Sequence, residues 1–175
     1  LPRTQPLQPR SMFRFIHTAD WQVGKVFGGF PAEKQGVLRD ARLSAVDRIA
    51  DAARAHGAAH VLVAGDVWDS ETLPAREIAH LVERLKAHGG LNWFLLPGNH
   101  DPDRPGGLYE RLARASLPEN VRLCRTPEVI SLSPGVAMLP APLRSRAESG
   151  DPTAWISRCG WSLRIVRKIA SARRT

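Results

Sequence analysis

The sequence has few cysteines and no long apolar run, and each shortage excludes a class of protein. Its two cysteines, Cys124 and Cys159, are too few and too far apart for a disulfide scaffold or a thiolate metal site. No apolar run approaches the roughly 18–20 residues that span a bilayer, so we expect no contact with a membrane. Residues 1–11 also lack the apolar segment of a secretory signal. These absences favour a protein of the reducing cytoplasm.

Acidic residues are outnumbered by basic ones, 17 to 25, which gives the chain a formal net charge of +8. The excess lies near the two ends, because residues 12–150 carry a net charge of only +1. Charge alone is therefore weak evidence for a nucleic-acid partner. The length of 175 residues and the hydrophobic content of 43% are sufficient for one domain with a substantial core.

Composition divides the chain into three parts. Residues 1–11 are rich in proline and have no periodicity, so we expect a disordered leader before a domain over residues 12–155. Residues 156–175 are basic and break the preceding pattern, and our interpretation is a tail that is not native to the fold, left by truncation or a frameshift. The alternative is a genuine short protein whose tail forms a basic amphipathic helix that contacts DNA, anionic lipid or a protein partner.

Apolar periodicity predicts strands and helices in alternation. A period of two or a continuous apolar run favours strands, and the expected strands lie within residues 13–17, 60–66, 91–101, 120–124, 128–132 and 135–139. Helical periodicity predicts helices over residues 32–56, 74–88 and 107–115. The apolar stripe of the first helix is expected to begin at Val37. The order predicts an α/β fold with a mixed, largely parallel sheet.

Polar residues follow each of the first three predicted strands. Asp20 follows the first, Asp66 the second, and the Asn99-His100-Asp101 cluster the third. In parallel sheets, sites lie beyond the carboxyl ends of the strands, so we expect these side chains to converge. Oxygen and imidazole ligands suit Mn, Fe or Zn, and a pair of such ions activates water and neutralises phosphoryl charge. The pattern favours phosphoester hydrolysis, with His100 as the acid or transition-state stabiliser.

Three segments carry a family resemblance. FIHTADWQVGK, VLVAGDVWDS and FLLPGNHDP resemble the first three motifs of the calcineurin-like metallophosphoesterases. They are most similar to the branch that contains the nuclease subunits of bacterial SbcC–SbcD-type DNA repair complexes. The resemblance covers residues 12–153. It implies the N-terminal part of an αββα sandwich and a DNA exonuclease with two divalent ions, expected to be manganese. The implied partners are DNA, an SMC-like or AAA-type ATPase and a second copy of the chain.

The resemblance also implies a role for each site residue. Asp20 would bind the first metal and Asp66 would bridge both, with Asp69 as a supporting carboxylate. Asn99 would bind the second metal. His100 would stabilise the transition state, and Asp101 would orient it. No residue is assigned to nucleic-acid contact.

Two departures from the family pattern affect this prediction. Gln22 stands where the family usually has a histidine, so we expect a weaker first metal and a more firmly held second one. The family also has further histidine ligands downstream, whereas none of the six histidines follows His100. The alternatives therefore stay open. They are a phosphoesterase that acts on nucleotides or phosphoproteins, and a non-catalytic remnant or scaffold that binds a partner ATPase or DNA.

Overall fold

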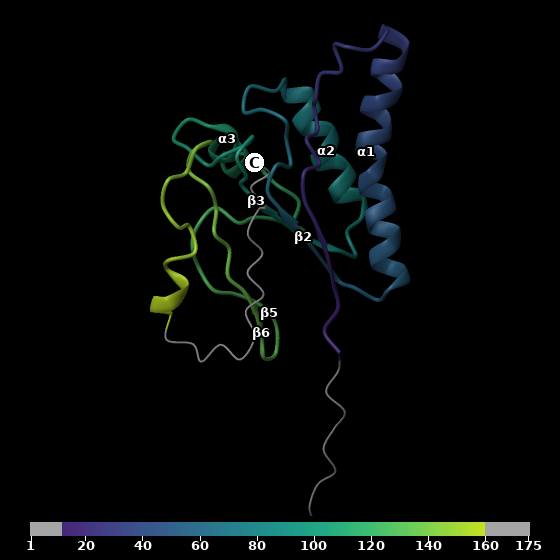
Figure 1. Ribbon diagram of the computed structural model, residues 1–175. Coiled ribbons are helices and arrows are strands. Elements are labelled where there is room, and N and C mark those ends of the chain that lie inside the picture. The colour runs from purple at the N-terminus through teal and green to yellow at the C-terminus, as the bar shows by residue number, and fades with distance from the viewer. Residues whose placement is uncertain (1–11, 160–175) are drawn as a thin grey trace, which may run out of the picture.

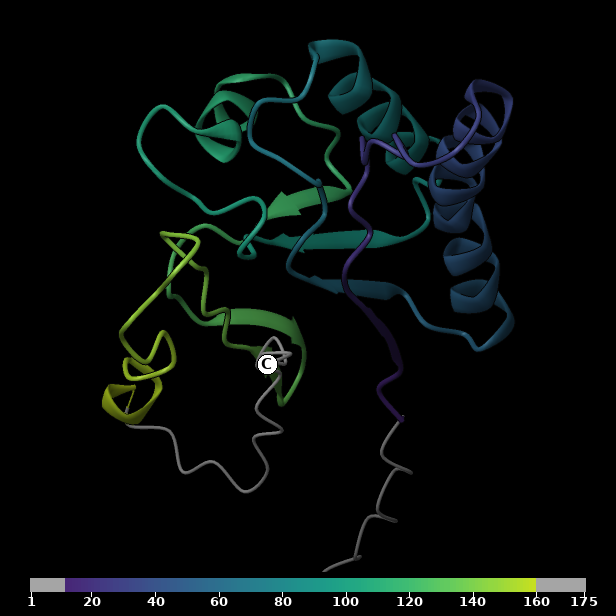
Figure 2. The same ribbon diagram turned by 45° about the horizontal axis from the view of Figure 1, so that its top comes forward.

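Four parallel strands form the central sheet of the computed structural model, which describes residues 12–159. The strands neighbour one another in chain order: β1 Phe15–Thr18, β2 His60–Ala64, β3 Asn92–Leu96 and β4 Val121–Leu123. Every pair is parallel. Figure 2 shows helices on one side of this sheet and a hairpin on the other. The prediction of an α/β fold with a largely parallel sheet is confirmed.

Three helices lie on the first face of the sheet: α1 Ala32–Ala55, α2 Ala75–Ala87 and α3 Leu108–Arg114. Val61 and Val63 of β2 are buried in the core that these helices share with the sheet. Burial of this apolar surface is the main source of stability. Val37 is an exception, because the first turns of α1 extend past the sheet (Figure 1) and leave it 68% exposed. Val37, the first residue of the predicted apolar stripe, is therefore not part of the core.

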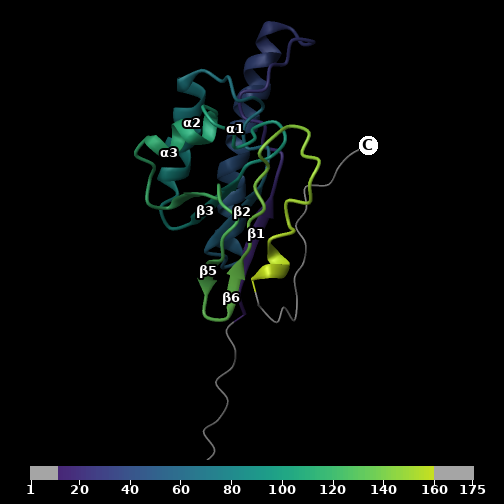
Figure 3. The same cartoon turned by 90° about the vertical axis from the view of Figure 1, so that its left-hand side faces the viewer.

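A hairpin of β5 Ile130–Ser133 and β6 Val136–Met138 covers part of the second face (Figure 3). Beneath it lies a smaller core: Leu62, Phe94, Cys124 and Ile130. The β1 side of this face is open, and Phe15 is 43% exposed. His60 stacks on Phe13 at a ring-centroid distance of 5.4 Å.

The chain continues past the hairpin to a short 3-10 helix, η1 Ile156–Arg158. None of the helices in residues 12–159 has the length and apolar character needed to cross a membrane. The leader predicted at residues 1–11 lies outside the described residues. So does most of the predicted tail, residues 160–175.

Candidate functional site

The loops that follow β1 and β2 run side by side at the carboxyl end of the sheet. The Asp20 backbone N–H donates to the Gly65 carbonyl at 3.2 Å, and the Gln22 N–H donates to the Asp66 carbonyl at 2.8 Å. Val23 then forms a parallel bridge with Trp68. Pairing thus continues beyond the strands, and it brings the backbone of Asp20, Gln22 and Asp66 together.

The same three residues have unusual backbone conformations. Asp20, Gln22 and Asp66 have φ values of 56°, 44° and 54°, and no other non-glycine residue within 12–159 has a positive φ. Aspartate tolerates the left-handed region better than most residues, whereas glutamine has no such preference. Each left-handed residue costs roughly 1–2 kcal/mol, and such strain clusters at functional sites. The sequence contains no local signal for these conformations.

The loop that follows β3 packs against the Asp66 side chain. The His100 backbone N–H donates to Asp66 Oδ1 at 2.9 Å. A Cβ added at Gly98 would lie 2.2 Å from the same oxygen, so only glycine allows this approach. Asn99, beside Gly98, is half-buried, and its side-chain amide has no hydrogen-bond partner among the described residues. Its oxygen is therefore available to a ligand.

Asp101 connects the loops, and none of the hydrogen bonds of its carboxylate within residues 12–159 involves His100. Its Oδ1 accepts hydrogen bonds from the backbone N–H groups of Asp66 and Gly98, at 3.2 and 2.8 Å. Its Oδ2 accepts from the Trp68 N–H and the Tyr109 hydroxyl, at 3.1 and 3.3 Å. The side chain is fully buried. Burial raises the pKa of Asp101 to about 7, although the two N–H donors on Trp68 and Gly98 act to lower it.

His100 is oriented by a backbone carbonyl. Its Nδ1 lies 3.2 Å from the carbonyl oxygen of Asp69. Because a carbonyl only accepts, Nδ1 carries the proton in this contact, and Nε2 is the atom available to a substrate. This contact, like the one made by Asp101, could not be read from the motif.

Lys25 is a site residue that the sequence interpretation missed. Its ammonium group donates to the Gln22 Oε1 at 2.9 Å and lies 3.8 Å from Asp69 Oδ1. The ammonium therefore links the predicted supporting carboxylate to the residue that stands in place of a histidine. Only the three-residue spacing between Gln22 and Lys25 could have suggested this contact.

The donor chemistry fits one hard divalent ion better than two. Within residues 12–159, no three His, Cys, Asp or Glu side chains come close enough together to hold a metal ion. An ion would therefore need the Asn99 amide oxygen in addition to the carboxylates of Asp20 and Asp66, and these oxygen donors suit Mn²⁺ or Mg²⁺. Gln22 is neutral, and its oxygen already accepts from Lys25. The Gln22 side thus does not fit a second ion.

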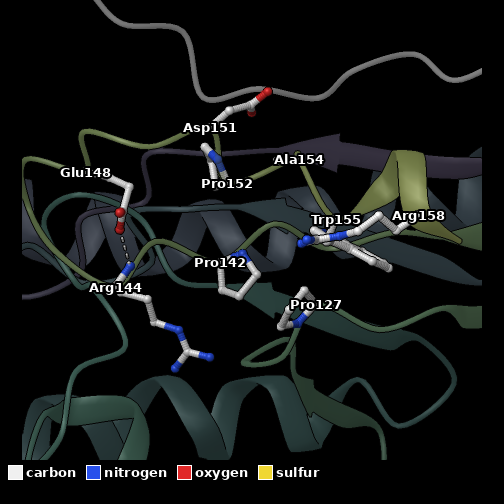
Figure 4. Close-up of a pocket in the computed structure, with 9 residues that line it drawn as sticks. All are labelled: Pro127, Pro142, Arg144, Glu148, Asp151, Pro152, Ala154, Trp155 and Arg158. Atoms are coloured by element: carbon white, nitrogen blue, oxygen red, sulfur yellow. Dashed lines mark hydrogen bonds between the residues drawn. The ribbon is translucent and has the colours of Figure 1, made fainter.

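A pocket elsewhere in the fold contains none of the predicted site residues (Figure 4). Its lining includes Arg144, Trp155 and Arg158. Arg144 also ion-pairs at 2.8 Å with Asp103, which is buried and has a second partner in Arg125 at 3.0 Å. The Arg144 pair joins the segment after β6 to the loop after β3, and the Arg125 pair joins the segment after β4 to the same loop. The candidate site therefore lies at the strand ends.

Comparison with known proteins identifies the domain. A model of the calcineurin-like phosphoesterase family matches residues 13–137. The chain belongs to this family. The match contains all three strand-end loops, so the chemistry associated with a calcineurin-like phosphoesterase, metal-dependent phosphoester hydrolysis, falls on the loops described above. None of the curated proteins compared with the chain matches it.

Proposed function

We propose that this calcineurin-like phosphoesterase is of the SbcD-like branch and hydrolyses phosphodiester bonds in DNA, as a cytoplasmic exonuclease subunit in DNA repair. The observation that carries the proposal is the convergence of three strand-end loops around strained acidic residues. Asp20 and Asp66 hold left-handed backbone conformations, and Asp66 contacts the loop of Asn99 and His100. Strain of this kind persists where the surrounding structure enforces a working geometry.

Each residue then has a defined task. Asp20, Asp66 and Asn99 would hold the divalent ion, manganese in this proposal, which when bound activates water and neutralises phosphoryl charge. His100, in the doubly protonated form, would give its Nε2 proton to the leaving oxygen, because its Nδ1 proton is held by the Asp69 carbonyl. Asp101 acts as a positioning residue that fixes the backbone beneath Asp66.

Basic side chains that contact the loop after β2 support a polyanionic substrate. Arg104 and Arg111 line a shallow hollow with Thr72. Both arginines contact Glu71, which lies two residues after Asp69 in the sequence. The Arg104 side chain is 60% exposed. Exposed arginines beside a hydrolytic site suit the phosphates that flank a scissile bond. In the same proposal, an SMC-like or AAA-type ATPase and a second copy of the chain are the protein partners.

The test compares two histidines on one protein. The purified chain receives Mn²⁺ and two substrates in parallel, bis-p-nitrophenyl phosphate and end-labelled linear duplex DNA. We expect His100→Ala to lower the rate on both by about 10²–10⁴-fold, the usual contribution of a general acid. His80→Ala is the matched control, because His80 is exposed on α2, and it should leave the rate unchanged.

The other outcomes separate the alternatives. Hydrolysis of the small ester without any cleavage of DNA would favour a phosphoesterase for nucleotides or phosphoproteins. Absence of hydrolysis of either substrate would favour a non-catalytic remnant or scaffold. The non-catalytic candidate is supported by Gln22, a neutral side chain at the position where the family usually has a histidine. It predicts binding of DNA or an ATPase partner with no turnover.

A further inference from the structure

We infer that the Lys25 ammonium group is the resident cation on the Gln22 side of the site, so that the chain takes a single divalent ion, through Asp20, Asp66 and Asn99. This inference rests on the proposed function, because it concerns the same strand-end loops. It assigns to Lys25 a role that the motif comparison gave to a metal ion.

The first support is the position of the ammonium between two loops. Lys25 Nζ donates to Gln22 Oε1 at 2.9 Å and lies 3.8 Å from Asp69 Oδ1. Its side chain is 39% exposed and that of Asp69 is 24% exposed, so the contacts lie at the edge of the site and not in bulk solvent. A lysine without a structural role would place its ammonium in water, where it is strongly hydrated.

The second support is the backbone that returns Lys25 to this place. The Lys25 N–H donates to the Gln22 carbonyl at 3.2 Å and closes a tight turn. Gly24 within the turn has a φ of 87°, and a Cβ there would lie 2.5 Å from the Leu73 side chain. The turn therefore requires glycine at this position, and it holds the side chains of Gln22 and Lys25 on the same side.

The third support is the chemistry of the Gln22 oxygen. An amide oxygen can accept a hydrogen bond from an ammonium or bind a metal ion, but an ion on the same oxygen would lie close to a like charge. Asp69 balances the ammonium, so the charge on this side is already compensated without a metal. An imidazole at position 22 would instead offer a nitrogen ligand of the kind that the family usually has at this position.

The experiment counts bound Mn²⁺ in the full chain, by calorimetry and by electron paramagnetic resonance of the free ion. We expect one Mn²⁺ per chain for the wild type, for Lys25→Arg, which keeps the cation, and for the control Lys34→Met on the exposed start of α1. The Gln22→His/Lys25→Met double variant should bind two. Circular dichroism checks that each variant is folded. If the double variant does not fold, the number of Mn²⁺ bound by the conservative Lys25→Arg variant can still be compared with that of the wild type.

Each result either supports or overturns the inference. Two ions in the wild type, or two in Lys25→Arg, would overturn the role of Lys25 while the proposed function stands. One ion with unchanged affinity in a folded double variant would do the same. Absence of Mn²⁺ binding in every variant would instead remove the proposed metal site itself, and the inference with it. Loss of the single wild-type ion in Asp66→Asn would place that ion at the strand ends, as inferred.

Discussion

Burial and hydrogen bonding compete at Asp101, and a measurement of stability against pH will test which of them dominates. Four donors approach the carboxylate, which favours its charged form, but complete burial disfavours that form. The outcome is a pKa raised from 3.8 to about 7. Burial thus outweighs the hydrogen bonds, and the folded protein prefers a protonated Asp101. We predict that Asp101→Asn removes this preference.

The magnitude follows from linkage. Between about pH 4 and pH 7, the folded carboxyl retains a proton that the unfolded one has lost. Raising the pH through this interval therefore lowers the free energy of unfolding, and the stabilising contribution is complete only below about pH 4. A pKa moved from 3.8 to about 7 corresponds to a loss of about 4 kcal/mol over the interval, as an order of magnitude. The constant cost of the amide substitution changes the level of the variant's curve and not its slope.

The assay is urea unfolding of metal-free protein in EDTA, from pH 4.5 to pH 8, followed by tryptophan fluorescence. The buried Trp21, Trp68 and Trp93 supply the signal. The difference between wild type and Asp101→Asn should shrink steadily as the pH rises and level off above pH 7. Asp51→Asn, at an exposed position on α1, is the control and should give a flat difference. A difference that grows with pH would refute the reasoning, because it would mean that the four hydrogen bonds outweigh burial.

Three further changes test the packing, an ion pair and a thiol. Gly98→Ala, whose Cβ would lie 2.2 Å from a carboxylate oxygen, should cost more than about 2 kcal/mol in urea unfolding. Gly90→Ala has open space and should cost under about 0.5 kcal/mol; equal costs would contradict the packing. Burial acts to raise the pKa of Asp47, but His88, directly after α2, and Arg84 on α2 lower it overall. The contribution of Asp47 to the free energy of unfolding, under about 1 kcal/mol, should therefore be present above pH 4 and vanish as the pH falls. Urea unfolding of Asp47→Asn tests this, and a stability difference from wild type that does not change with pH would contradict it. Burial raises the pKa of the Cys124 thiol to about 12. A thiol reagent at pH 8 should therefore label only Cys159 in the folded protein, and both cysteines in urea. Mass spectrometry locates the label, and labelling of Cys124 before Cys159 would contradict this prediction.

Much of the fold could be predicted because its signals are local. Prolines precede α1 and α2, and Gly57, with a φ of 62°, follows α1, so the predicted helix bounds differ from the observed ones by about one residue. The strand prediction worked because buried parallel strands have continuous apolar runs. Exposure was harder to predict. An apolar stripe does not reveal how far the sheet extends beneath a helix, and Val37 lies beyond that point.

The convergence of the three strand-end loops was predictable, but their individual contacts were not. The rule that sites lie beyond the carboxyl ends of parallel strands is sufficient to place Asp20, Asp66 and Asn99 at one edge. The contacts of Asp101 and Lys25 depend on loop conformations, and residue preference gives no reason to expect a left-handed Gln22. A motif therefore identifies the residues, while the turn geometry decides which atom each one faces.

The strained loops also bear on how many ions the proposed site can hold. Three left-handed residues together cost roughly 3–6 kcal/mol, yet the loops hold them through backbone pairing between Gln22 and Asp66 and through the four donors on Asp101. The fold itself therefore carries this strain, and an arriving ion does not have to order the loops. A preorganised site of this kind depends mainly on the identity of its ligands. Substitution of Gln22 and Lys25 should accordingly change the number of bound ions without a change in the backbone. The Gln22–Lys25 side-chain pair, and not the fold, would then determine whether an ion binds on the Gln22 side of the site.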